Sequence, residues 1–104
     1  MGIRCFEHGI FRKNYIFVIN DIGDVIVNLA SPELEGENMY EFQDAKGIYF
    51  FREMIDVAKN DGSGWVNYWW PKPGEEEASH KTSYVIKVMK GNETFIVGTG
   101  IYLD

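Results

Sequence analysis

The side chains best suited to chemistry in this chain are aromatic, and they lie close together in one short segment. Residues 65–70 hold three tryptophans and a tyrosine, and the segment stops at a Pro-x-Pro-Gly sequence over residues 71–74. In a β-strand, alternate side chains point to opposite faces. The two sets are Val66, Tyr68 and Trp70 on one face, and Trp65, Asn67 and Trp69 on the other. One aromatic face can fill a core while the other lines a pocket or contacts a partner, so the chemistry indicated is binding.

Two lysines are the candidate counter-charges for an anionic ligand. Lys81 and Lys87 lie in one predicted strand, with Tyr84 between them. A carboxylate that leaves water needs a cation or several hydrogen-bond donors to offset its lost solvation. The alternative is that each lysine is a solvated surface side chain. The overall charge opposes an anion, because sixteen acidic against ten basic residues give a net charge of −6.

Groups that could catalyse a reaction are not arranged to do so. Cys5 has no histidine or aspartate tied to it, and His8 and His80 stand at no metal-ligand spacing. Gly98-x-Gly100 is not a nucleotide-binding loop, since no helix follows it; glycines inside a strand more often mark a bulge or a close backbone approach. We therefore expect no enzymatic activity, no metal and no cofactor.

Length and composition indicate a single globular domain. The chain has 104 residues, of which 45% are hydrophobic and 25% charged. Nucleic acid is a poor partner, because the basic residues are scattered rather than clustered. No apolar stretch approaches the roughly 20 residues that span a bilayer, and residues 1–8 lack the apolar region of a signal peptide. Membrane attachment is thus expected only through segments outside this chain.

The order of elements predicts an α+β domain on an antiparallel sheet. Residues 14–19 and 25–29 predict a hairpin, and residues 31–38 a loop. Asn38 and Glu41 have the spacing of a capping box, which predicts a short helical turn at 39–42. One helix is predicted over about 46–60, with Gly62 at its end. Strands are predicted over 65–70, 81–89 and 94–103.

Several of these segments, in this order, resemble the single Cache domain. They are Tyr15-Ile16-Phe17-Val18, Pro32-Glu33-Leu34-Glu35-Gly36-Glu37-Asn38, Gly64-Trp65-Val66-Asn67-Tyr68, Trp70-Pro71-Lys72-Pro73, Lys81-Thr82-Ser83-Tyr84-Val85 and Gly98-Thr99-Gly100-Ile101-Tyr102-Leu103-Asp104. The resemblance implies a PAS-like antiparallel sheet of about five strands over residues 12–104. Residues 1–11 would be a remnant of, or a substitute for, the long helix that usually opens the family. Relatives often have His-Pro where this chain has Asn28-Leu29, and arginine where it has Trp69.

The same resemblance implies a function. Cache domains are typically the extracytoplasmic sensors of chemoreceptors, histidine kinases and cyclases, where they bind small metabolites, often carboxylates. We therefore expect a small-molecule sensor domain of a signal-transduction protein that recognises a small organic acid. The expected location is extracytoplasmic, either as part of a membrane-bound receptor or as a secreted protein.

The resemblance also assigns the two faces of the aromatic strand. Relatives often carry charge at the positions of Asn67 and Trp69, which places Tyr68 and Trp70 toward the ligand; the alternative is that both are core aromatics. Asn28 either reads a ligand or is an exposed strand asparagine. The predicted ligand-binding residues are Tyr15, Phe17, Asn28, Tyr68, Trp70, Lys81 and Tyr84.

A second function from another class fits the same strand. If the usual long helix is missing, the face with Trp65 and Trp69 loses its cover, and an uncovered aromatic face is an interaction surface. The alternative hypothesis is therefore an interaction or dimerisation module, with a homodimer as its simplest form.

Overall fold

Five strands and two helical elements make up the fold, which is taken from a computed structural model that describes residues 16–103. They follow in the order β1 (Ile16–Asn20), β2 (Val25–Asn28), the 3-10 helix η1 (Pro32–Leu34), α3 (Phe50–Asp61), β3 (Ser63–Pro71), β4 (Ala78–Lys90) and β5 (Glu93–Tyr102). The predicted boundary between residues 11 and 12 lies outside the described residues, as do Cys5, His8 and Tyr15.

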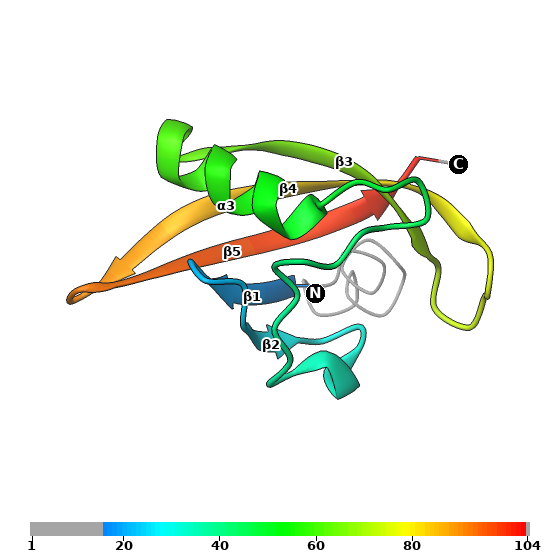
Figure 1. The fold of residues 1–104 in the computed structure, drawn as a ribbon, viewed down its shortest axis with the longest axis horizontal. Helices are drawn as coiled ribbons and strands as arrows, with labels where there is room; N and C mark the ends of the chain where they lie inside the picture. Colours follow the sequence, from blue (N-terminus) through cyan, green and yellow to red (C-terminus); the bar gives the residue numbers. More distant parts are fainter. Residues whose placement is uncertain (1–15, 104) are drawn as a thin grey trace, which may run out of the picture.

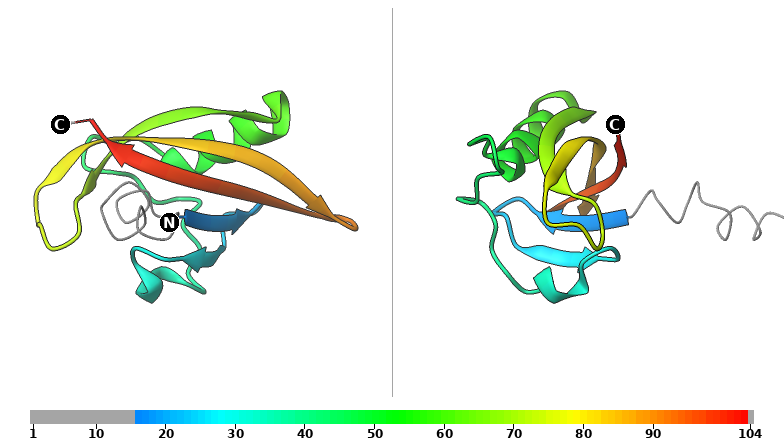
Figure 2. Two further views of the ribbon diagram at one scale, coloured as in Figure 1. Left: turned by 180° about the vertical axis from the view of Figure 1, so that it is seen from behind. Right: turned by 90° about the vertical axis from the view of Figure 1, so that its right-hand side faces the viewer.

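All five strands form one antiparallel sheet, in the order β2-β1-β5-β4-β3. The central strand is therefore β5, the last in sequence, and β3 is an edge strand (Figure 1). Helix α3 packs on one face of the sheet, against β3, β4 and β5, and the segment between β2 and α3 runs along the same side (Figures 1 and 2). This arrangement confirms the predicted five-stranded sheet with one main helix.

The helix packs as its sequence pattern predicts. The apolar stripe of α3 is buried and consists of Phe50, Phe51, Met54, Ile55 and Ala58. These side chains meet inward-pointing residues of the strands, among them Ile19, Val66, Val85 and Ile96. Gly62 ends the helix in the left-handed conformation, with φ of 83°, and its N–H donates to the Ala58 carbonyl.

The helix begins at Phe50 rather than near residue 46, because the Asp44 carboxylate binds backbone N–H groups of the residues before it in a turn. Asp44 Oδ1 accepts hydrogen bonds from the N–H groups of Lys46, at 2.9 Å, and Ile48, at 2.8 Å. Gly47, with φ of 84°, completes this turn. Asp44 Oδ2 accepts a third bond, at 2.8 Å, from the N–H of Trp69. That N–H belongs to the edge strand, so one buried carboxylate joins the helix entry to the sheet edge.

Two local predictions need correction. The predicted helical turn at 39–42 is only a hydrogen-bonded turn, from Phe42 N–H to the Met39 carbonyl. Its capping box does not form, because the side-chain oxygen of Asn38 accepts a bond from the N–H of Tyr40, only two residues on, and the Glu41 carboxylate pairs with Arg52. The second correction concerns β4, which begins at Ala78 and not at residue 81, because Ser79 and His80 still pair with Trp70 and Trp69.

The Asp44 carboxylate gives a first test. We expect Asp44→Ala to lower the free energy of unfolding by about 2–4 kcal/mol, because three backbone N–H groups lose a charged acceptor. Urea denaturation measures the difference. The matched control is Asp56→Ala on the exposed side of α3, expected to change stability by less than about 0.5 kcal/mol. Equal effects of the two substitutions would contradict the proposed role of Asp44.

Candidate functional site

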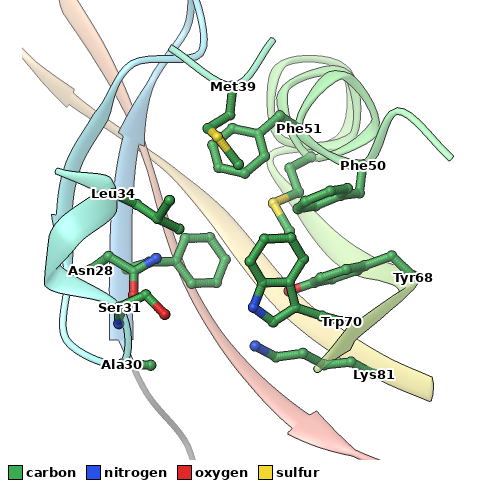
Figure 3. A pocket seen from close by; sticks show the side chains of 12 residues that line it. Asn28, Ala30, Ser31, Leu34, Met39, Phe50, Phe51, Tyr68, Trp70 and Lys81 are labelled. Carbon is green, nitrogen blue, oxygen red and sulfur yellow. Dashed lines mark hydrogen bonds between the residues drawn. The ribbon is translucent and has the colours of Figure 1, made fainter. Parts of the chain in front are cut away.

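A small cavity lies between α3 and the sheet, and its volume is about 40 Å³. A single water molecule needs roughly 10–15 Å³, so the cavity has room for a few waters or a small organic molecule. Its apolar wall comes from the helix, from β1 and from the segment after β2: Phe17, Leu34, Met39, Phe50, Phe51 and Met54. Polar atoms come from Asn28, Ser31, Tyr68, Trp70 and Lys81 (Figure 3).

Two glycines of the central strand leave room for this site. A Cβ added to Gly98 would overlap the ring of Phe17, which lies across β5 from β1. A Cβ on Gly100 would lie 2.7 Å from Cε of Lys81. Real Cβ atoms do not come this close to other atoms, so Phe17 and Lys81 occupy the space that a side chain at Gly98 or Gly100 would need. The structure thus confirms a close approach at Gly98-x-Gly100.

Lys81 extends along the cavity rather than into solvent. Its ammonium lies 5.8 Å from the ring centroid of Tyr68 and 5.1 Å from that of Tyr102. Among residues 16–103 the ammonium makes no ion pair and no hydrogen bond, and burial lowers the pKa of Lys81 to about 8. A cation in this position lacks a counter-charge that an anion could supply.

Three further donors face the same space. The side-chain oxygen of Asn28 accepts a bond from the Ser31 N–H at 2.8 Å, which leaves the amide nitrogen of Asn28 pointing toward the cavity (Figure 3). The Ser31 hydroxyl and the Trp70 indole N–H have no hydrogen-bond partner within the described residues, and Figure 3 shows both directed at the space in front of Lys81. Among residues 16–103, no carboxylate lines the cavity, so the polar side that they form presents mainly donors.

Tyr68 is fixed more firmly than the other polar residues. It is buried, its ring stacks on Phe50 with centroids 4.5 Å apart, and its hydroxyl lies 2.8 Å from Oγ of Ser83. Burial raises the pKa of the Tyr68 phenol, so the group is neutral at any physiological pH. Tyr68 therefore contributes a rigid wall, and its hydroxyl already has a partner.

The structure brings five of the seven predicted ligand-binding residues to one cavity: Phe17, Asn28, Tyr68, Trp70 and Lys81. Tyr15 lies outside the described residues. The placement of Tyr84 needs correction, because it pairs with Trp65 on the opposite face of the sheet, with ring centroids 5.0 Å apart. Lys87, the other candidate counter-charge, is exposed and does not line the cavity. Ser31 lines the cavity although the sequence placed it only in a loop.

The outer face differs from the prediction at one residue. Trp65 is 60% exposed, as expected of an uncovered aromatic. Trp69 is half-buried instead: it stacks on His80 with ring centroids 5.0 Å apart, and the Lys46 ammonium lies 4.9 Å from its ring centroid. Trp69 is therefore part of a local cluster that includes a cation, and does not add to an open aromatic surface.

Comparison with known families gives one match that spans nearly the whole chain. The family described as "Cache domain" matches residues 6–104. Among curated proteins, the methyl-accepting chemotaxis protein McpP of Pseudomonas putida is 38% identical over 89 residues, which cover 85% of this chain and 16% of McpP. The sensor histidine kinase MctS of Rhizobium johnstonii is 33% identical over 93 residues, covering 89% of this chain and 20% of MctS. The chain thus spans less than a quarter of the length of these relatives.

Solved structures share the fold. A "Periplasmic sensor domain of chemotaxis protein" superposes with a TM-score of 0.81 at 30% identity, covering 88% of this chain and 62% of that one. A second structure, described as "Structural basis for carboxylic acid recognition by a Cache chemosensory domain", has a TM-score of 0.80 at 36% identity, covering 88% and 60%. Within the described part of this chain, no helix is long and apolar enough to cross a membrane.

The lowered pKa of Lys81 predicts how stability depends on pH. The folded state releases this proton near pH 8, whereas the unfolded state holds it to about pH 10.5. Stability should therefore rise between these values as the pH increases, and this contribution is lost as the pH falls through 8. Lys81→Met should remove that rise and stabilise the ligand-free domain at pH 7, as measured by thermal denaturation at several pH values.

The matched control for this test is Lys87→Met, which changes an exposed lysine of the same strand. It should leave the rise in stability between pH 8 and 10.5 as it is in the original chain. A rise that persists in Lys81→Met would show that other groups cause it.

Proposed function

Because this chain belongs to the Cache domain family, we propose that it is the ligand-binding sensor domain of a longer signal-transduction protein. Its curated relatives are chemotaxis proteins and a sensor histidine kinase, by their names, and the region matched is a small part of each. An extracytoplasmic position for the domain is part of this proposal, and the likeness to a periplasmic sensor domain supports it. The role is recognition rather than catalysis.

The ligand that we propose is a small monocarboxylate. The observation that carries this proposal is the Lys81 ammonium, which is largely buried, has no ion pair among residues 16–103 and faces the donors of Asn28, Ser31 and Trp70. A carboxylate would supply the missing counter-charge and accept several of these hydrogen bonds at once. The likeness to a domain described as recognising carboxylic acids supports the same class of ligand.

The size of the cavity narrows the class further. About 40 Å³ admits acids of two or three carbons and not long chains. The apolar side of the cavity, with Leu34, Met39 and Met54, suits the methyl or methylene end of such an acid. Acetate, propionate, pyruvate and lactate are therefore the compounds to test.

A thermal-shift series with these four acids tests the proposal. Ligand at 100 times its dissociation constant adds about 2.7 kcal/mol to stability, which raises Tm by roughly ten degrees in a domain of this size. Lys81→Met should abolish the shift, because the carboxylate loses the one cation that the described residues place in the cavity wall. No shift with any acid would argue against carboxylate sensing.

Two controls make this experiment specific. Lys87→Met, on the same strand but outside the cavity, should leave the shift unchanged. Affinity should also fall about tenfold per pH unit above pH 8, because the acid binds the protonated form of Lys81. Binding that strengthens above pH 8, or that survives Lys81→Met, would contradict the assigned role of Lys81.

The homodimer expected from the sequence stays a prediction. In its favour, Trp65, Tyr84 and Ile86 are exposed together on the outer face of β3 and β4. If a second copy covers this face, Trp65→Asp should turn a dimer into a monomer in light scattering. The matched control is Asn67→Asp, two residues along the same face. A monomer in the unsubstituted chain would remove the prediction.

A further inference from the structure

A second, larger hollow adjoins the cavity. It is a groove of about 580 Å³ on the outside of the molecule, between residues 42–45, the end of β3 and the turn that follows it. The groove and the cavity share two lining residues, Ser31 and Trp70. The two spaces therefore meet at these side chains, of which Trp70 is the larger.

Two ring contacts hold the indole of Trp70 in place. Its centroid lies 5.5 Å from that of Phe50, on the cavity side, and 5.9 Å from that of Phe42, which lines the groove. Phe42 is itself exposed, and Trp70 lies near the end of an edge strand, one residue before a proline. A large side chain at this position stands between the cavity and the groove, and a small one would join the two spaces.

From this geometry we infer that Trp70 determines the length of the acid that the domain accepts, an inference that rests on the proposed carboxylate ligand. The head group binds at Lys81, and on this side of the indole the tail has a cavity of about 40 Å³ to occupy, so the indole sets the limit toward the groove. Without the indole, the tail of a longer acid extends into the groove, along Phe42 and Pro71. Trp70 is thus a specificity-determining residue.

The test measures dissociation constants for acetate, propionate, butanoate and pentanoate by calorimetry. In the unsubstituted chain, pentanoate should bind at least tenfold more weakly than propionate. In Trp70→Ala the order should reverse, because each added CH₂ that finds apolar contact improves affinity about fourfold. An unchanged order in a folded Trp70→Ala variant would overturn the inference.

Two further variants separate the wall from other roles of the residue. Trp65→Ala removes an indole from the opposite face of the same strand and should leave the order of the four acids unchanged. Trp70→Phe keeps an aromatic ring but lacks the N–H, so it should weaken all four acids by a similar factor and preserve their order. A reversed order in Trp65→Ala would show that the effect is not local to the wall.

Failure of the carboxylate proposal itself would look different. If the unsubstituted chain binds none of the four acids, the uncharged alcohols 1-butanol and 1-pentanol replace them in a thermal-shift measurement. Stabilisation of Trp70→Ala but not of the unsubstituted chain would still support Trp70 as the wall. Equal responses of the two proteins would overturn that role.

Discussion

The site depends on the bare backbone of the central strand. Gly98 and Gly100 carry no side chain on the face that α3 covers, so β5 leaves a shallow trough in the middle of the sheet. Phe17 crosses this trough from one neighbouring strand and Lys81 from the other. A Cβ at either glycine would displace them, because the Phe17 ring and the Lys81 side chain already lie against the glycine backbone. The two glycines of β5 therefore provide the room, and the neighbouring strands provide the side chains that line the cavity.

The electrostatics of the site are local. The chain carries a net charge of −6, which disfavours an anion at long range and low salt. Within the cavity the balance is reversed, because an ammonium and three neutral donors converge and none of the described lining residues is a carboxylate. Short-range interactions in a partly buried site are less screened than the field of the surface charges. The same burial lowers the pKa of Lys81, so the protonated lysine is destabilised, and a bound carboxylate would offset this destabilisation.

Much of this could be predicted from the sequence, and the failures have physical causes. The alternation in residues 65–70 separated Tyr68 and Trp70 from Trp65 and Trp69, and the apolar stripe located the helix, because both patterns repeat locally. Which of the two faces points inward came from the resemblance to Cache domains. Tyr84 was grouped with Lys81 although three residues along a strand always reach the opposite face; the strand period alone excludes the pair. Ser31 gave no such signal, because its place in the cavity depends on residues distant in the chain. The same holds for the bond from the Trp69 N–H to Asp44, although the bonds of Asp44 to Lys46 and Ile48 are local. The partial burial of Trp69 depends in the same way on Lys46.

The buried position of Lys81 has a consequence for heat as well as for affinity. Near neutral pH a fraction of the free domain carries this lysine without its proton, whereas a domain holding an anion would keep it protonated. Binding would then draw protons from the buffer, and the enthalpy measured by calorimetry would include the ionisation heat of that buffer. The domain would respond to the concentrations of the anion and of hydrogen ions together, so the ligand concentration that half-saturates it would depend on the pH of its surroundings.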